Sequence, residues 1–315
     1  MTVTAVLLGA TQVLVVVALA PLLVGVMRRV RARLEGRVGP SVWQPWRDTR
    51  KLFRKERIRP MHTSWVFTVA PAVILSTTVV VVAACPLIAT QATLGPVGDL
   101  FVVVYLLLLG TVALALAGLD PGTAFGGMGA SREMTIAALA EPAVLLAVFA
   151  LSVPAKSSNL GTIVAATIAA PERAVSPASL LALVAFLIVT LAEAGRLPVD
   201  NPTTHLELTM IHEAMVLEYA GPDLALVELG AAMRLTVLLG LIASLFIPFG
   251  IATSVTGGAL VLGFSAFLVK VIALGVGLAV FEVFTAKLRL FRVPELLSVA
   301  FILAFLAVVV SFFLS

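Results

Sequence analysis

The chain alternates long apolar runs with short polar segments. Eight runs are each near the roughly 20 residues that a helix needs to cross about 30 Å of hydrocarbon. They cover residues 3–27, 64–90, 99–119, 132–153, 178–194, 223–249, 257–286 and 294–315. Their length favours helices over the alternating strands of a membrane β-barrel. The pattern therefore predicts an all-α polytopic membrane protein with about eight transmembrane helices in a single domain, residues 1–315.

Composition indicates the same class. Hydrophobic residues make up 61% of the chain and charged residues only 12%, whereas a water-soluble domain has about 45–50% apolar and about 25% charged residues. This argues against a soluble enzyme, a disordered chain and a nucleic-acid-binding protein. The single cysteine, Cys85, excludes an internal disulfide and an iron–sulfur cluster held by this chain alone, since a cluster takes about four thiolates.

The basic residues predict the orientation of the chain in the membrane. Twelve of the 21 Lys and Arg residues lie between residues 28 and 60. Cytoplasmic loops carry such an excess of basic residues. The positive-inside rule therefore predicts that four loops of this chain are cytoplasmic. These are residues 28–63, 120–131, 195–222 and 287–293. Both termini are then expected outside, in a multi-pass protein of the inner (cytoplasmic) membrane.

Aromatic residues are set among the charges of loop 28–63. Trp46 and Phe53 are seven residues apart, so they share one face if this segment is helical. The plainest interpretation is contact with anionic lipid headgroups. The sharper hypothesis is a segment that lies on the membrane and also docks a soluble partner. The residues assigned to docking are Arg37, Trp43, Trp46, Arg47, Arg50, Lys51 and Arg54.

The glycine-rich loop 120–131 carries no nucleotide-binding motif. Gly127 and Gly129 are not followed by the third glycine of a dinucleotide fingerprint, and no GxxxxGK[ST] sequence is present. Ser131 is instead a plausible N-cap for the span that follows.

Loop 195–222 contains a segment, 203–219, that can be helical. Glu207 and Glu218 would then share one face. His205 and His212 are seven residues apart, which places them about 10 Å apart along a helix axis. Two zinc ligands on one helix favour a spacing of four residues instead. Neither a metal site nor a catalytic constellation is therefore predicted.

Ionisable side chains inside the predicted spans are functional candidates, because a charge at the bilayer centre costs roughly 2.5–3.5 kcal/mol. Glu141 lies deep in its span, and Pro142 after it frees a backbone carbonyl one turn back. Such groups either relay protons or form ion pairs that merely hold helices together. The candidates are Glu141, Glu193, Glu228, Arg234, Lys270 and Glu282.

Three motifs resemble one protein family. ARLEGRVGPSVWQPWRDTRKLFRKE at 32–56 resembles the first cytoplasmic loop of the H-subunit-like membrane proteins of respiratory complex I and related hydrogenases. GLDPGTAFGGMGASREMT at 118–135, with Glu141 after it, is similar to a loop and helix of the hydrogenase branch. RLPVD at 196–200 and the glutamates after it resemble a further loop. The chain is thus identified as a member of that family, in the branch of formate hydrogenlyase and membrane-bound NiFe hydrogenases.

The resemblance implies a membrane-anchoring and coupling subunit that binds no cofactor itself. It implies soluble hydrogenase large and small subunits, an iron–sulfur subunit, antiporter-like membrane subunits and membrane lipids as partners. The NiFe centre and the iron–sulfur clusters are expected in those partners, where electron transfer would drive proton or sodium translocation in a respiratory chain. The residues that the resemblance places in a buried acidic chain are Glu141, Glu193, Glu207, Glu213, Glu218 and Glu228.

Two departures from the quinone-reducing branch make a quinone site doubtful. Gln44 follows Gly39-Pro40 more closely than in that branch, and Ala138 stands where that branch usually carries its glutamate, about a turn before Glu141. Two alternatives stay open. One is a quinone-binding subunit of an NADH–quinone oxidoreductase, and the other is a stand-alone ion transporter, although the sequence shows no repeat of the kind that many transporters carry.

Overall fold

The structure is a computed structural model that describes residues 3–91, 94–200, 210–254 and 256–314. Within these ranges the chain is nearly all helical, and it forms no strand beyond two isolated bridges. The α-helices are α1 (Val3–Leu34), α2 (Gln44–Phe53), α3 (Trp65–Ala84), α4 (Leu100–Leu119), α5 (Ala124–Ala155), α6 (Leu160–Ala169), α7 (Pro177–Glu193), α8 (His212–Val216), α9 (Gly221–Phe246), α10 (Gly257–Phe284) and α11 (Val293–Leu314). Short 3-10 helices are η1 (Gly95–Val97), η2 (Pro171–Val175) and η3 (Leu290–Arg292). The predicted all-α fold is confirmed.

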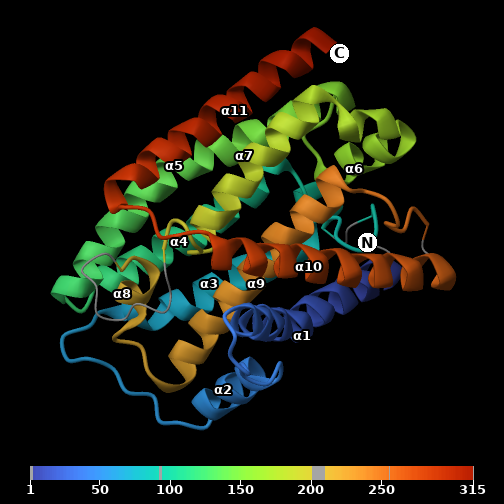
Figure 1. The fold of residues 1–315 in the computed structure, drawn as a ribbon. Helices are drawn as coiled ribbons and strands as arrows, with labels where there is room; N and C mark the ends of the chain where they lie inside the picture. Colours follow the sequence, from blue (N-terminus) through green and yellow to red (C-terminus); the bar gives the residue numbers. More distant parts are fainter. Residues whose placement is uncertain (1–2, 92–93, 201–209, 255, 315) are drawn as a thin grey trace.

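Each of the eight predicted spans corresponds to a helix (Figure 1). Seven of these helices are long and apolar enough to cross a membrane, namely α1, α3, α4, α5, α9, α10 and α11. The eighth, α7, has 17 residues and packs against both α5 and α11. The additional helix α6 has only 10 residues, too few to cross the hydrocarbon layer.

Helix α9 forms the centre of the bundle. Of its most apolar stretch 83% is buried, against 22% in α10. It packs against α1, α3, α7 and α10, and most of its apolar stretch therefore contacts protein. The outer face of α10 is exposed in the described chain.

Helix α5 begins earlier than predicted, and the prediction of Ser131 as its N-cap is wrong. The hydroxyl of Thr123 accepts the N–H of Gly126, and this cap starts the helix at Ala124. The glycines that suggested a loop instead allow close packing. A Cβ at Gly126 would lie 2.1 Å from the Gly118 carbonyl oxygen of α4, and one at Gly129 would lie 2.8 Å from the Ile211 oxygen.

The helix predicted over 203–219 differs from the observed one. Residues 201–209, which include Glu207 and His205, lie outside the described residues. The described part holds only the short helix α8, which ends at Val216. Glu218 therefore follows the helix, and the prediction that one helix continues through residue 219 is wrong.

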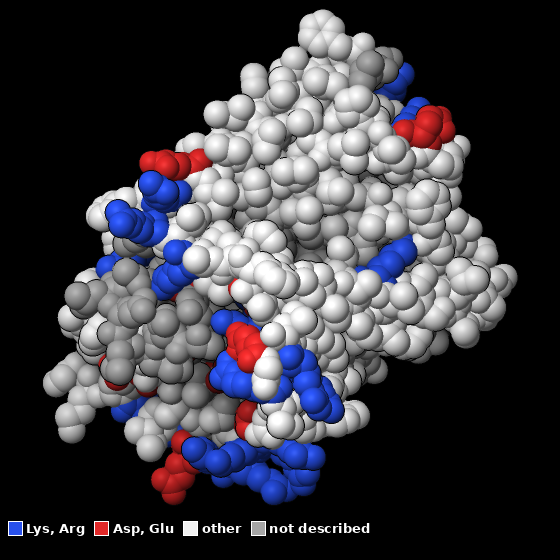
Figure 2. Space-filling view, in the orientation of Figure 1, with Lys and Arg blue, Asp and Glu red and all other residues white. Residues whose placement is uncertain are grey.

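Charged side chains gather at one end of the molecule. Figure 2 shows blue and red side chains concentrated in the lower and left parts of the view, around α2 and α8, and a wide, mostly white surface above them. A small second group lies at the opposite end, close to α6 (Figure 2). The uncharged zone between them is the part of the surface suited to hydrocarbon.

Candidate functional site

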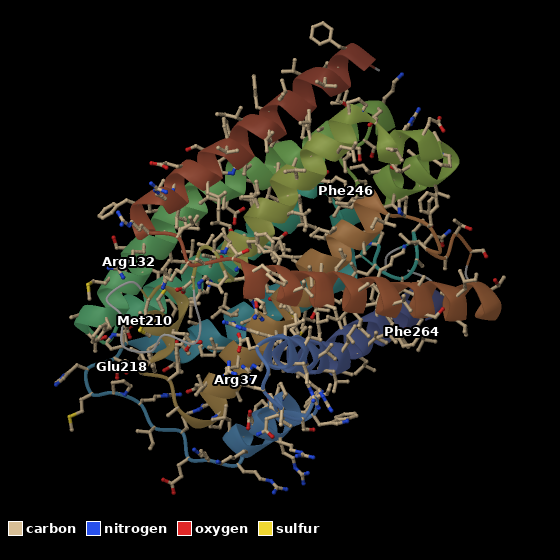
Figure 3. All side chains as sticks on the ribbon, in the orientation of Figure 1. Arg37, Arg132, Met210, Glu218, Phe246 and Phe264 are labelled. Carbon is tan, nitrogen blue, oxygen red and sulfur yellow. The ribbon has the colours of Figure 1, made fainter. Side chains whose placement is uncertain are left out.

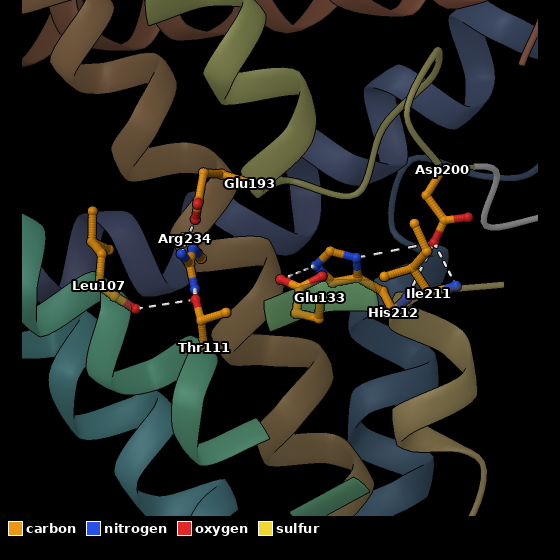
Figure 4. Close-up of polar contacts among 8 residues, drawn as sticks. All are labelled: Leu107, Thr111, Glu133, Glu193, Asp200, Ile211, His212 and Arg234. Atoms are coloured by element: carbon orange, nitrogen blue, oxygen red, sulfur yellow. Dashed lines mark hydrogen bonds and ion pairs between the residues drawn. The ribbon is translucent and has the colours of Figure 1, made fainter. Parts of the chain in front are cut away.

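The first part of the candidate site is an ion pair inside the helix bundle. Glu193 ends α7 and is 7% exposed. The guanidinium of Arg234, from the middle of α9, pairs with the Glu193 carboxylate. Arg234 Nη1 also donates to Thr111 Oγ1 of α4, 2.6 Å away (Figure 4). Three helices thus meet at one partly buried cation, whose charge is compensated by a carboxylate.

Glu141 lies beside a small cavity that Glu193 also lines. The volume of the cavity is about 20 Å³, which is room for about one water molecule. Its remaining walls are apolar and include Phe186 and Leu238. Glu141 is 8% exposed and lies within electrostatic range of Glu193 and Arg234. The cavity therefore brings two carboxylates, from α5 and α7, to one small space whose other walls are apolar.

A second group of charges surrounds His212, the first residue of α8. His212 Nε2 lies 3.6 Å from Oε1 of Glu133, a residue of α5 that is 3% exposed. The other ring nitrogen, Nδ1, lies 4.0 Å from Oδ2 of Asp200, which is 2% exposed. Figure 4 shows the imidazole between the two carboxylates. Glu133 is also within electrostatic range of Glu193 and Arg234, so the two groups of charges are neighbours.

Asp200 also organises the backbone at the start of α8. Its Oδ2 accepts the backbone N–H of Ile211 at 3.2 Å and that of His212 at 3.1 Å. Its Oδ1 lies 3.4 Å from Lys287 Nζ. These contacts hold the Asp200 carboxylate between the chain at the start of α8 and Lys287.

A large cavity of about 970 Å³ opens beside this second group. Its wall is formed by α1, α2, α8, α9 and α10 together with residues 194–200. The charged or titratable residues that line it are Arg28, Arg31, Glu35, Arg37, Asp48, Arg196, Asp200, His212, Glu213, Glu228 and Glu282. The cavity therefore connects the basic loop after α1 with His212 through a space large enough for many water molecules.

Ion pairs stand along the wall of the large cavity. The Glu282 carboxylate lies 3.6 Å from Arg196 Nη1 and 3.9 Å from Arg31 Nη1. Burial lowers the pKa of Arg196, and the attraction of Glu282 opposes that shift. Hydrogen bonds from Arg37 and then Arg31 hold the pKa of Glu35 below its ordinary value. Glu35 therefore stays negatively charged at neutral pH, since its pKa is shifted further away from 7.

Helix α2 and the loops beside it hold the residues assigned to docking. Trp46 is half-buried, and its Nε1 donates to the Ala18 carbonyl of α1, 3.1 Å away. The tryptophan thus ties α2 to α1. The other assigned residues are exposed, and they are Arg37, Trp43, Arg47, Arg50, Lys51 and Arg54. The structure therefore presents one basic surface, centred on α2, at the charged end of the molecule.

The segment after α2 is attached to the start of α9. Arg57 Nη2 lies 2.9 Å from the Asp223 carboxylate, and Arg59 Nε lies 3.9 Å from it. Gly221, with a φ of +58°, meets the Glu56 carbonyl so closely that a Cβ would lie 2.3 Å from that oxygen. The basic loop is thus in direct contact with the loop that carries α8.

The remaining predicted relay residues lie in different surroundings. Glu213 and Glu228 line the large cavity with Glu282. Glu218 is half-buried and lines neither cavity. Lys270 donates from Nζ to the carbonyl oxygens of Ile247 and Phe249, which follow the end of α9. The structure therefore does not bring Lys270 together with the acidic residues.

Labelled side chains in Figure 3 locate these groups in the fold. Arg132, Met210 and Glu218 lie towards the charged end of the molecule, as does Arg37, whereas Phe246 ends α9 farther up the view. Arg132 Nη1 donates to the Met210 carbonyl at 3.0 Å, so α5 holds the chain just before α8.

Comparison with known proteins assigns the family. The sequence profile of the NADH dehydrogenase family matches residues 7–312. This chain belongs to that family. It is 33% identical to "Hydrogenase-4 component C" of Escherichia coli (strain K12), over 96% of this chain and 94% of the relative. It is 34% identical to "Formate hydrogenlyase subunit 4" of the same strain, over 95% of this chain and 96% of the relative.

A more distant relative and a solved structure are similar as well. The H subunit of the NADH-quinone oxidoreductase of Syntrophotalea carbinolica (strain DSM 2380 / NBRC 103641 / GraBd1) is 29% identical, over 74% of this chain and 73% of the relative. A solved chain of the membrane-bound sulfane sulfur reductase, an archaeal respiratory membrane complex, shares the fold with a TM-score of 0.82 and 19% identity. That match covers 98% of this chain and 99% of the other.

The predicted membership in the family of H-subunit-like membrane proteins is confirmed, and so is the predicted similarity to hydrogenase subunits. This member of the NADH dehydrogenase family is a multi-pass protein of the cytoplasmic membrane. It is a membrane subunit of the type found in hydrogenase complexes and complex I-like respiratory complexes. No cluster of three or more metal-ligating side chains occurs among its described residues.

Sequence reasoning missed Glu133 and the positions of Asp200 and His212 in this family member. Glu133 was overlooked because the span was expected to begin at 132, which would place this residue at the water boundary. Thr123 carried the signal that could have found it, since a threonine cap at 123 puts Glu133 well inside α5. The contact between His212 and Asp200 had no such signal, because it depends on the fold of residues 195–212.

Proposed function

We propose that this chain is the membrane-anchoring and coupling subunit of an energy-conserving NiFe hydrogenase complex of the formate hydrogenlyase type. It links electron transfer in a soluble arm to the movement of protons or sodium ions through buried acidic residues. The observation that carries the proposal is the series of buried charges that leads inward from the large cavity to Glu141, together with the hydrogenase names of the two relatives that align over nearly the whole chain.

The anchoring role rests on the basic surface centred on α2. Its exposed cations stand next to the exposed aromatic rings of Trp43 and Phe53, which are 57% and 47% exposed. Aromatic and arginine side chains together are typical of protein–protein contacts. The partner subunits implied are the soluble large and small hydrogenase subunits and an iron–sulfur subunit, and these would hold the NiFe centre and the clusters.

The coupling role rests on the arrangement of charges between the two cavities. Glu133, Glu193 and Glu141 come from two helices and surround Arg234, so each carboxylate lies near the next. A proton that moves along them changes the charge next to Arg234 at every step. Antiporter-like membrane subunits in the same complex would receive that change.

A quinone-binding subunit is the second candidate function, because the large cavity has room for a quinone ring. The sequence departures at Gln44 and Ala138 argue against it, and so does the highly charged lining of the cavity. Copurification in mild detergent separates the two functions. A NiFe large subunit supports the hydrogenase complex, whereas flavin-containing and NADH-binding subunits support the alternative.

Charge reversal tests the docking surface. Arg50, Lys51 and Arg54 changed together to glutamate are expected to release the soluble arm, while this chain still inserts in the membrane. The matched control reverses Lys156, which follows the C-terminal end of α5, and Arg173 of η2, which donates to the Pro154 carbonyl at that same end of α5. An intact complex after the first change would contradict docking at α2, as would equal loss of the arm in the control.

A further inference from the structure

The His212 ring stands at a boundary between water and the buried acids. Its side chain is 28% exposed and lines the large cavity. Its Nε2 points towards Glu133, whose side chain is only 4% exposed. The ring therefore faces the cavity on one side and the interior of α5 on the other. In the part of the chain that the structure describes, Glu133 Oε2 and His212 Nδ1 are buried without a hydrogen-bond partner.

The surrounding chain holds the backbone of His212 in place. Asp200 binds the N–H of His212, and Arg132 binds the carbonyl of Met210 just before it. Gly195 lies against the ring, since a Cβ there would be 2.8 Å from Nδ1. The glycine also has a φ of +56°, which other residues adopt at a cost. The backbone that carries the imidazole is thus held by α5, by the segment after α7 and by α8.

We propose that His212 carries protons between the large cavity and Glu133, and so forms the entrance to the buried acidic chain. The inference rests on the proposed function and names the group through which protons enter. The charged groups around the ring are Glu133 of α5, Asp200 with Lys287 beside it, and the neighbouring Glu213 of α8. Imidazole suits this place because each of its two nitrogens can bind or release a proton.

The proposed step conserves the number of protons. A neutral ring that carries its hydrogen on Nε2 binds a proton at the buried Nδ1 and becomes an imidazolium. Asp200, which lines the cavity and lies 4.0 Å from Nδ1, passes this proton from the cavity water to the ring. The Nε2 proton then passes to Oε1 of the Glu133 carboxylate, which becomes a neutral acid, and the ring is again neutral with its hydrogen on Nδ1. A turn of the ring, or proton exchange with water in the cavity, restores the first form.

The distances suit a group that moves between two partners. The separations of 3.6 Å and 4.0 Å are longer than a hydrogen bond. A rotation of the side chain shortens one of them, and a water molecule can bridge the other. A purely structural salt bridge would instead hold one short contact.

The test compares two histidine variants of the intact complex in sealed vesicles. In His212→Gln the side chain keeps hydrogen-bonding groups but no longer takes up a proton near neutral pH. We expect proton uptake to fall by about 100-fold, the low end of what acid–base groups contribute. Hydrogen formation with an artificial electron carrier should stay unchanged. His62→Gln, which alters an exposed histidine of the loop before α3, is the matched control and should keep full uptake.

Chemical rescue gives the second measurement. His212→Ala leaves a space that opens to the large cavity, so free imidazole added on the cytoplasmic side should restore proton uptake. Imidazole should not restore uptake in Glu133→Gln, whose missing group is a carboxylate. Full uptake in an assembled His212→Gln complex would overturn the proposal. So would failure of both His212 variants to assemble, because the ring would then be structural.

The same vesicles distinguish this inference from the proposed function. If Glu141→Gln stops uptake while His212→Gln does not, only the role of His212 fails. If Glu141→Gln and Glu193→Gln both leave uptake intact, the acidic chain itself is wrong and the proposed function fails with it.

Discussion

Two cations inside predicted spans, Arg234 and Lys270, have opposite surroundings. Arg234 lies on α9, the most deeply buried of the seven long helices, and pairs with Glu193. Lys270 lies on α10, the least buried of them, and its Nζ binds two backbone carbonyls at the end of α9. One cation is compensated by a titratable group, and the other by groups that never titrate.

The difference shows that a charged residue inside a membrane span can have either of two roles. Hydropathy alone makes both residues functional candidates, because each places a costly charge in an apolar helix. A cation at a helix C-terminus is favoured by the partial negative charge of the last carbonyls, and it needs no further role. A cation beside carboxylates is part of an electrostatic unit whose charge can change.

Removal of Arg234 should have the largest effect on stability. Arg234→Met leaves Glu193 as a buried carboxylate without its cation, and loss of one partner of such a pair costs about 3–5 kcal/mol. The loss is measured by thermal unfolding of the purified chain in detergent. The double variant Glu193→Gln with Arg234→Met removes both charges and should recover part of the stability. If the single variant unfolds at the wild-type temperature, the pair contributes no stability.

A smaller effect is expected where the backbone positions His212. Gly195→Ala forces a Cβ against the ring and places alanine at a left-handed φ, which costs about 1–2 kcal/mol. The unfolding temperature should fall, and proton uptake should slow because the imidazole is displaced. Gly127→Ala is the matched control, since a Cβ at that helical position meets nothing within 4 Å. Equal behaviour of the two alanine variants would show that the ring does not need the space at residue 195.

The smallest effect belongs to Lys270. Lys270→Met removes a cation from the end of α9, an interaction worth about 0.3–1 kcal/mol. Unfolding in detergent should change little, and proton uptake by the assembled complex should stay at its wild-type rate. A large loss of uptake with normal assembly would place Lys270 in the relay after all.

The helices could be predicted from the sequence because their apolar runs are long. The location of each of the eight predicted spans follows from the length of its apolar run alone, although the predicted start of α5 is wrong. Residues 120–131 show why the ends are harder. Gly126 and Gly129 suggest a loop on local preference, but tight packing against α4 and the start of α8 favours glycine in a helix.

The candidate site could be predicted only in part. Glu141, Glu193 and Arg234 are conspicuous because they are charges within apolar runs. Glu133 and Asp200 are not, since each belongs by sequence to a polar segment and becomes buried only when α8 folds against α5. Pairings between residues so far apart depend on tertiary structure, which periodicity does not report.

The most direct test of the account is the proton gradient formed for each hydrogen molecule produced in sealed vesicles. The measurement compares Glu141→Gln with Lys270→Met, two variants that each remove one intramembrane charge. The account predicts that both complexes assemble and form hydrogen with an artificial electron carrier, and that only Glu141→Gln loses the gradient. A full gradient in the assembled Glu141→Gln complex would contradict the claim that the buried acids couple the two processes.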